Sequence, residues 1–309
     1  MPRISVLLPA HDATATIARA VGSTLRALPA DSELVVLDDA STDATADEAA
    51  RVGDPRVRVL RSTVPSGVAG ALSTLLDATD SEVVVRMDAD DVSLPWRVRD
   101  GLAALDAGSE IVFATTVEVG PGRRVRPMAP LPVGHGAFGL HLLLSNFVCH
   151  PTMTARRSTL DALGGYREVP SEDYDLWLRA AARGTGMRRI ARPGLLYRKH
   201  AAQVTASSAW SSASRRDPSI AAAYGDLSER LLGSRLPRLV ALETRPPRER
   251  DAGLWAFEDA FRQAAAALRG AERRALESKL RRRLERVRRA PWPAPSAVPG
   301  TAPTGGASA

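Results

Sequence analysis

The 309-residue sequence predicts an α/β fold with a mostly parallel central sheet, helices on both of its faces and a helical C-terminal extension. Apolar runs without polar alternation recur between segments of helical periodicity, which is typical of parallel strands buried on both faces. Two of these runs also end in paired aspartates. The carboxyl ends of parallel strands meet at one edge of a sheet, and open α/β folds place their ligands there.

The first ninety residues predict a regular alternation of strands and helices. Four apolar strands are expected, at residues 4–8, 33–37, 57–60 and 83–87. Two helices with an apolar face at spacings of three or four are expected at residues 17–28 and 67–78. Ser41 or Thr42 is expected to cap a shorter helix, with Asp43 in its first turn, where the helix dipole favours an acid.

The remaining chain predicts further elements in less regular order. A helix at residues 93–107 and a strand at 110–116 precede an exposed hairpin around Gly120, Pro121 and Gly122. Two more helices are expected, at residues 134–145 and from Ser171 onward, followed by a short strand at 195–197. Residues 206–214 read as a loop, and later helices are expected at 220–232, 253–268 and 272–287.

Alternating carboxylates close the fourth strand, at Asp88, Asp90 and Asp91. Asp88 and Asp90 are two positions apart on an extended chain, so they point the same way. Two carboxylates held this close repel each other unless a divalent cation joins them, and hard oxygen ligands suit Mg²⁺ or Mn²⁺. The pattern predicts a metal bound together with a phosphate. The alternative is a polar turn that leads to a helix at Ser93.

The sequence lacks residues that several enzyme classes require. Lysine occurs only at positions 199 and 279, so P-loop and kinase chemistry has no candidate lysine near the N-terminus. The first strand is followed by no G-x-G-x-x-G, which argues against a dinucleotide-binding dehydrogenase. A nucleotidyltransferase shares paired aspartates but normally needs a Gly-rich basic loop, and residues 9–16 have neither feature.

The net charge of +7 belongs to the C-terminal third, because residues 1–200 are close to neutral. This basic third contains an apolar stripe that consists of Leu276, Leu280, Leu284 and Val287. The stripe predicts packing on the first domain, a coiled-coil partner or contact with an anionic membrane surface. The single cysteine excludes an internal disulfide, and no apolar run reaches the ~20 residues of a membrane span. With a strand at the N-terminus in place of a signal peptide, we expect a cytoplasmic protein, peripheral at the inner face of the membrane if the stripe contacts lipid, and no nucleic-acid partner.

Seven motifs in order resemble those of inverting family 2 glycosyltransferases. They cover the first two thirds of the chain and read ISVLLPAHD (4–12), LDDASTD (37–43), RMDADD (86–91), HPTM (150–153), LGGY (163–166), EDYDLWLR (172–179) and YRKH (197–200). The resemblance implies the GT-A fold of nucleotide-diphospho-sugar transferases. It also implies sugar transfer from a nucleotide diphosphate, most often UDP, in cell-surface polysaccharide or glycoconjugate synthesis.

The resemblance assigns a role to each candidate site residue. Asp88 and Asp90 would hold Mn²⁺ or Mg²⁺, with His200 as a further ligand, and Asp88 would also contact the donor. The remaining donor-binding residues are Asp39 for the base, Pro9 and Asp12 for the pocket wall, and Arg86 for a phosphate or the neighbouring aspartates. Asp173 is the expected catalytic base.

A single base suffices because a metal-neutralised diphosphate leaves without a proton, so no second acid is required. The alternative role of Asp173 is to complement the helix dipole. The acceptor would be a glycan, a lipid-linked sugar or another hydroxyl compound. A catalytically inactive partner subunit that binds a nucleotide sugar is the alternative to an enzyme.

These expectations divide the chain into three parts. Residues 1–205 form the catalytic domain, residues 206–290 a helical basic extension, and residues 291–309 a disordered tail rich in Pro, Gly, Ala and Ser.

Overall fold

The computed structural model describes residues 2–200, 203 and 207–291. Its sheet is formed by β1 Ile4–Ala10, β2 Ser32–Asp39, β3 Val57–Ser62, β4 Val83–Arg86, β5 Val92–Ser93, β6 Ile111–Val119, β7 Val125–Pro127, β8 Thr154–Arg156 and β9 Met187–Arg198. The α-helices are α1 Ile17–Ala27, α2 Thr45–Ala50, α3 Gly67–Asp77, α4 Arg97–Asp106, α5 His135–Leu144, α6 Arg157–Ala162, α7 Glu172–Arg183, α8 Ser208–Arg216, α9 Pro218–Leu232, α10 Leu239–Leu242, α11 Pro247–Ala265 and α12 Gly270–Arg288.

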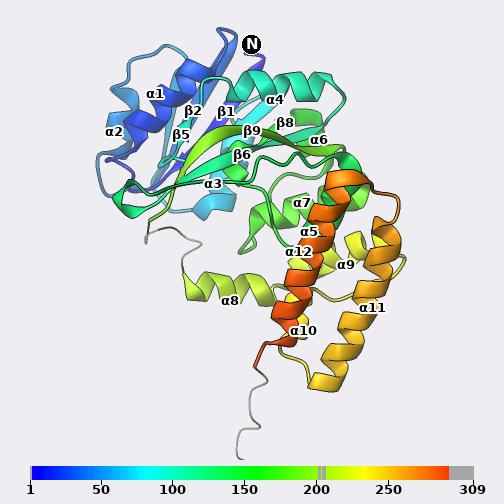
Figure 1. The fold of residues 1–309 in the computed structure, drawn as a ribbon. Coiled ribbons are helices and arrows are strands. Elements are labelled where there is room, and N and C mark those ends of the chain that lie inside the picture. Colours follow the sequence, from blue (N-terminus) through cyan, green and yellow to red (C-terminus); the bar gives the residue numbers. More distant parts are fainter. Residues whose placement is uncertain (1, 201–202, 204–206, 292–309) are drawn as a thin grey trace, which may run out of the picture.

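The strands form one sheet in the order β3-β2-β1-β4-β8-β6-β9-β5, with β7 paired to β6. The first four of these strands are parallel. The second half is mixed, since β8 is antiparallel to both β4 and β6 whereas β6 and β9 are parallel. Figure 1 shows this sheet in the upper part of the molecule and helices α8 to α12 below it.

Alternate side chains of β1 pack into two separate hydrophobic cores, one on each face of the sheet. Val6 and Leu8 pack with α1 and α4 on one face of the sheet. Leu7 packs on the other face with α3, α5 and α7. This double burial explains why the parallel strands are apolar throughout, and it confirms the predicted helices on both faces.

Three local predictions are wrong, each because a distant contact decides the structure. The helix expected from Ser93 begins at Arg97, because Val92 and Ser93 pair with β9 as strand β5. The loop expected at residues 206–214 contains helix α8, whose N-cap is the side chain of Ser207. The helix after β2 begins at Thr45, and its expected caps Ser41 and Thr42 bond to the loop after β1 instead.

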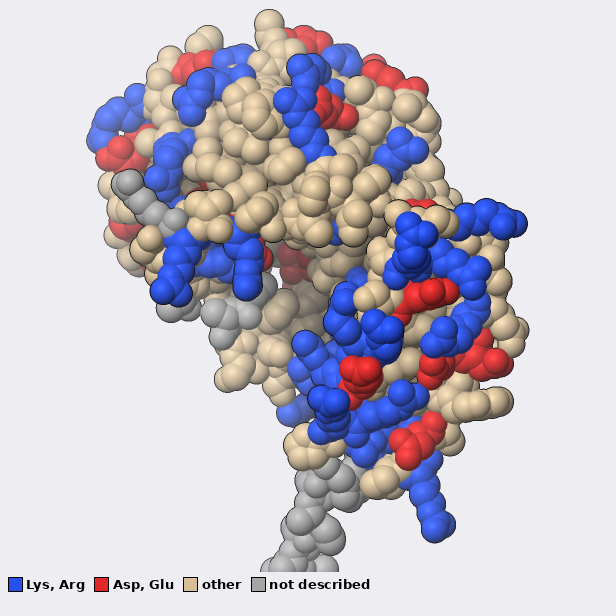
Figure 2. Space-filling model, in the orientation of Figure 1, with Lys and Arg blue, Asp and Glu red and all other residues tan. Residues whose placement is uncertain are grey.

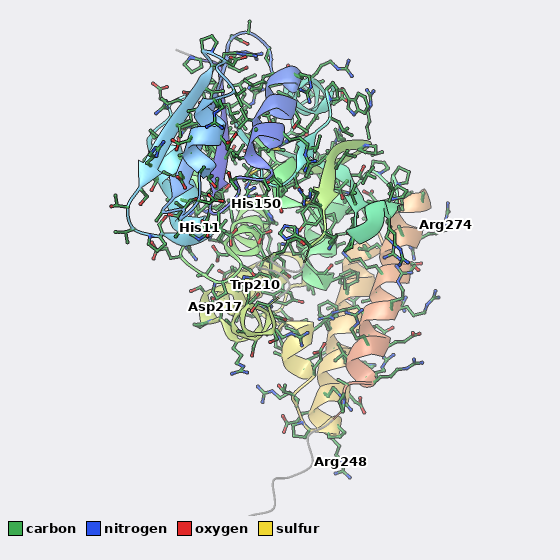
Figure 3. The ribbon with its side chains drawn as sticks, turned by 90° about the vertical axis from the view of Figure 1, so that its left-hand side faces the viewer. His11, His150, Trp210, Asp217, Arg248 and Arg274 are labelled. Atoms are coloured by element: carbon green, nitrogen blue, oxygen red, sulfur yellow. The ribbon has the colours of Figure 1, made fainter. Side chains whose placement is uncertain are left out.

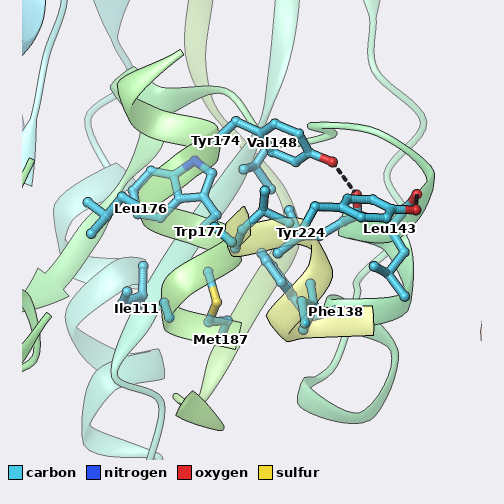
Figure 4. Packing of buried hydrophobic residues seen from close by; sticks show 14 of the residues in the cluster. Ile111, Phe138, Leu143, Val148, Tyr174, Leu176, Trp177, Met187 and Tyr224 are labelled. Carbon is cyan, nitrogen blue, oxygen red and sulfur yellow. Dashed lines mark hydrogen bonds between the residues drawn. The ribbon is translucent and has the colours of Figure 1, made fainter. Parts of the chain in front are cut away.

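The C-terminal helices are not a separate layer with a core of their own. The apolar stripe of α12 is at most 1% exposed, and it belongs to the same cluster as the apolar residues of α5 and α7. Packing on the rest of the chain is therefore the structural role of the stripe. Figure 4 shows part of this cluster, in which Tyr224 of α9 lies beside Tyr174 of α7. The division of the chain at residue 205 stays a prediction, and most of the expected tail lies outside the described residues.

Replacing Leu280 by Ala is expected to lower the free energy of unfolding by about 2–5 kcal/mol, because it leaves a cavity in the shared core. Urea unfolding followed by circular dichroism measures this loss. The exposed neighbour Arg281 is the control, and its replacement by Ala should change stability by less than about 0.5 kcal/mol. Equal stability of both variants would mean that α12 is an independent appendage.

Candidate functional site

The expected site residues meet at the carboxyl edge of the parallel strands. Strand pairing sets Ala10 beside Asp38, and Leu7 beside Arg86. The loops that leave β1, β2 and β4 therefore emerge next to one another. Figure 2 shows a hollow below the sheet-containing part of the molecule, with acidic side chains in its depth and basic side chains around it.

An acidic cluster lies directly after β4. Asp88, Asp90 and Asp91 can each offer a carboxylate oxygen such that the three atoms lie within 4.8 Å of one another. Asp91 is fully buried, and its Oδ1 accepts a hydrogen bond of 2.9 Å from the Arg198 amide. Burial, with a contribution from the charge of Asp90, raises the pKa of Asp91 to about 8. Three clustered oxygens, one from a buried carboxylate, form a donor set that fits a divalent cation.

Asp91 was not expected as a member of this cluster. Its other oxygen, Oδ2, is buried and has no hydrogen-bond partner among the described residues. The triplet of aspartates is visible in the sequence. Alternation along an extended chain brings only its first two members together, whereas the turn after β4 adds the third.

Cationic side chains flank the two expected metal ligands. Arg86 forms an ion pair with Asp88, and burial lowers the pKa of its guanidinium. His200 Nε2 lies 2.7 Å from Asp90 Oδ2, just beyond the end of β9. The structure thus places His200 beside the cluster, as expected, and it pairs Arg86 with an aspartate.

Asp39 holds the start of helix α3. Its Oδ1 accepts hydrogen bonds of 2.8 Å from the backbone and hydroxyl of Ser66, and its Oδ2 accepts one of 2.9 Å from the Gly67 amide. Gly67 has a φ of 68°, a left-handed conformation that glycine adopts without strain. A carboxylate accepts about four hydrogen bonds, so one site remains for a ligand.

Asp12 fastens the loop after β1 to the loop after β2. Its amide donates to Ser41 Oγ at 2.9 Å, and its Oδ1 accepts from the Thr42 amide at 2.8 Å. Asp12 adopts a φ of 45°, which is uncommon outside glycine. The preceding residue, His11, has Nδ1 2.8 Å from the Asp39 carbonyl oxygen and therefore donates through that nitrogen. Pro9 is half-buried near the end of β1, just before this loop.

Asp173 lies in the first turn of α7, and Asn146 donates a hydrogen bond of 2.8 Å to its Oδ2. Burial and then the adjacent charge of Glu172 raise the pKa of Asp173 above its ordinary value, while the hydrogen bond from Asn146 opposes the rise. A raised pKa makes a carboxylate a better proton acceptor near neutral pH. Sequence reasoning missed Asn146, which follows the end of α5 without a recognisable motif.

His150 is the buried neighbour of these acids. Its Nε2 lies 3.0 Å from the Tyr166 hydroxyl, and its Nδ1 lies 3.6 Å from Glu172 Oε1. Burial lowers the pKa of His150 to about 3, so the ring is neutral at physiological pH. Figure 3 shows His11 and His150 toward the lower edge of the sheet, above the helical part that carries Trp210.

Cys149 interacts electrostatically both with the acidic cluster, through Asp91, and with Asp173. Burial raises the pKa of its thiol, and the charges of both Asp91 and Asp173 raise it further. Arg86 likewise interacts with Glu172 as well as with Asp91. The two groups of acids therefore lie within electrostatic range of the same side chains and belong to one site.

Comparison with known sequences finds one matching family model, "Glycosyl transferase family 2", over residues 5–164. A protein of Bacillus subtilis named EpsE is 30% identical over 191 residues, which is 58% of this chain and 66% of that protein. The Escherichia coli protein WfgD, named a UDP-Glc:alpha-D-GlcNAc-diphosphoundecaprenol beta-1,3-glucosyltransferase, is 32% identical over 57% of this chain and 68% of its own. The succinoglycan biosynthesis protein ExoU of Rhizobium meliloti is 32% identical over 60% of this chain and 59% of its own. The chain thus spans about two thirds of the length of these relatives.

Solved structures share the fold at low sequence identity. Residues 1–349 of Staphylococcus aureus TarS, in complex with UDP-GlcNAc, superpose with a TM-score of 0.59 at 16% identity, covering 93% of this chain and 90% of TarS. The mannosyltransferase PcManGT of Pyrobaculum calidifontis, in complex with GDP-Man and Mn²⁺, has a TM-score of 0.50 at 20% identity, covering 90% and 79%. This likeness confirms the expected GT-A fold. None of the helices in the described part of the chain combines the length and apolarity that spanning a bilayer requires.

Proposed function

The chain belongs to glycosyl transferase family 2 and is an inverting glycosyltransferase, and we propose that it transfers a sugar from a uridine diphosphate donor to a hydroxyl group of a lipid-linked or other glycan acceptor. The observation that carries this proposal is the acidic cluster after β4, which shares the neighbouring side chains Cys149 and Arg86 with the acids at the start of α7. The name of WfgD and the ligand of TarS support a uridine nucleotide as the donor. The ligand of PcManGT is a guanosine nucleotide, so the same fold also binds that nucleoside.

Asp88 and Asp90 would hold the metal ion, with a carboxylate oxygen of Asp91 as a third donor. Mn²⁺ or Mg²⁺ bound there would neutralise charge on the departing diphosphate. Arg86 is buried beside Asp88 and would fix that carboxylate, while His200 would fix Asp90. Both contacts would keep the carboxylates oriented toward the metal site.

Asp173 would take the proton from the acceptor hydroxyl as that hydroxyl attacks the anomeric carbon. Attack on the face opposite the leaving diphosphate inverts the anomeric centre, and one base is enough for this single displacement. The hydrogen bond from Asn146 occupies one side of Oδ2. The carboxylate therefore keeps a fixed orientation with lone pairs free for the acceptor.

The nucleoside would lie between the loops after β1 and β2. Pro9 and Asp12 would form its wall, since the hydrogen bonds of Asp12 to Ser41 and Thr42 hold these two loops together. Asp39 would accept a hydrogen bond from the base through its one remaining acceptor site. Its contacts with Ser66 and Gly67 would keep the carboxylate in place for that bond.

Nucleotide sugars should stabilise the protein only in the presence of Mn²⁺ or Mg²⁺. A ligand at one hundred times its dissociation constant adds about 2.7 kcal/mol to the free energy of unfolding, so thermal unfolding detects a bound donor. We expect the largest shift from a uridine diphosphate sugar and little shift in chelator. Equal stabilisation with and without chelator would remove the metal from the proposal. No stabilisation by any nucleotide sugar would contradict donor binding.

A further inference from the structure

Six basic side chains gather where α8, α10 and α12 meet, and we refer to them as the basic cluster: Arg215, Arg238, Lys279, Arg282, Arg283 and Arg286. Glu243 is the carboxylate that pairs with them in the described part of the chain. Its two oxygens lie 2.8 Å from Arg215 Nη1 and 3.7 Å from Arg283 Nη1. One carboxylate leaves most of this positive charge without compensation.

The inner members of the basic cluster are short of hydrogen-bond acceptors. Among the described residues, Lys279 donates only to the His141 carbonyl oxygen, at 3.2 Å, and it lies 4.6 Å from the centre of the Phe147 ring. Burial and then the charges of Arg189, Arg282 and Arg283 lower the pKa of Lys279 to about 7. The Nε atom of Arg283 is buried without a partner among the described residues. Partly buried cations with so little anionic compensation are costly, and a bound anion would remove that cost.

Two members of the basic cluster contact the chain neighbours of Asp173 and Asn146. The guanidinium of Arg238 is 5.5 Å from the ring centre of Tyr174, the residue that follows Asp173. Phe147, which Lys279 overlies, follows Asn146, the hydrogen-bond donor to Asp173. In Figure 2, basic side chains gather over α12 along the lower wall of the hollow. A ligand on the basic cluster would therefore approach the site from the helical side, whereas the donor would occupy the sheet edge.

We propose that the basic cluster binds a phosphate or diphosphate group carried by the acceptor. This inference rests on the proposed function, because it names the class of acceptor for the same site. Guanidinium groups bind phosphate oxygens through paired, charge-assisted hydrogen bonds, and several of them on one wall suit a diphosphate. The anion would hold the acceptor by its phosphorylated end and leave its sugar hydroxyl toward Asp173.

A flat anionic membrane is the less suitable occupant of the basic cluster, because Lys279 and Arg283 are partly buried between helices. The outer face of α12 is the surface that a membrane would meet. There, Arg274 and Arg281 are exposed, and Glu277 lies between them in the sequence and lines the same crevice. This face provides a matched control, since it carries the same residue types on the same helix.

The test measures binding of geranyl diphosphate by calorimetry in the presence of chelator, which keeps a metal-dependent donor site out of the measurement. The double variant Arg282→Gln/Arg286→Gln should weaken this binding about tenfold or more, because it removes two charge-assisted hydrogen-bond donors to the phosphate. The control Arg274→Gln/Arg281→Gln removes the same charge from the outer face and should bind normally. Asp90→Ala should also bind normally, since the probe does not need the acidic cluster.

Three results would overturn the proposal: no binding by the unaltered protein, equal loss in both double variants, or loss in Asp90→Ala. Equal binding of geraniol would overturn it too, because the phosphate would then contribute nothing. Inorganic pyrophosphate should bind at the same cluster, and a weaker affinity than geranyl diphosphate would identify the lipid-linked source. Binding to phosphatidylglycerol vesicles without binding of geranyl diphosphate would assign the arginines to a membrane instead. Donor binding with Mn²⁺ is measured separately, so failure of the proposed function is distinguishable.

Discussion

Replacement of Asp173 by Asn is expected to lower turnover about 10²–10⁴-fold, the usual contribution of a single general base. Asparagine keeps the shape of the side chain and can still accept a hydrogen bond from Asn146, but it cannot take a proton from the acceptor. Donor affinity should therefore stay unchanged. Steady-state kinetics together with a donor titration would show a loss confined to turnover.

The pH dependence of the same reaction separates a base from a helix-dipole acid. Because burial and Glu172 raise the pKa of Asp173, activity should fall on acidification at a pH above the ordinary carboxylate range. Glu172→Gln removes one cause of the raised pKa, so this acidic limb should move to lower pH while transfer persists. Near-normal transfer by Asp173→Asn would reduce Asp173 to a helix-dipole acid, and the base would then have to be Glu172, Asp175 or His200.

Replacement of Asp90 by Ala is expected to abolish donor binding and transfer together. It removes one of the three clustered carboxylates and the partner of His200, so the metal and the diphosphate lose their site. Calorimetric titration of a uridine diphosphate sugar with Mn²⁺ measures the loss. Asp106, an exposed carboxylate paired with Arg156, is the matched control, and its replacement by Ala should leave affinity unchanged. Normal donor affinity in Asp90→Ala would place the metal elsewhere.

The sequence predicts most of the sheet edge because local patterns encode it. Unbroken apolar strands followed by aspartates define both the parallel half of the sheet and the loops after β1, β2 and β4. Those loops form by short-range turns, so Asp12, Asp39 and Asp88 lie at the same edge. His200 is found beside Asp90 for the related reason that β9 ends at this edge.

Features that depend on long-range contacts were not predictable in this way. The strand β5 exists because residues 92 and 93 pair with β9, about one hundred positions later. Asn146 is recognisable as a partner of Asp173 only when α5 and α7 are packed together. The helices after residue 205 follow from apolar periodicity, but their shared core with α5 and α7 does not, because periodicity gives the buried face of a helix and not its partner.

The anomeric configuration of the transferred sugar tests the central claim most directly. A uridine diphosphate sugar with an α-linked sugar should give a β-linked product, because a single displacement assisted by Asp173 inverts the reacting carbon. Nuclear magnetic resonance of the product distinguishes the two linkages, and Asp173→Asn should form the same product at a greatly reduced rate. An α-linked product would contradict inversion and the single-base mechanism on which the assignment of Asp173 rests.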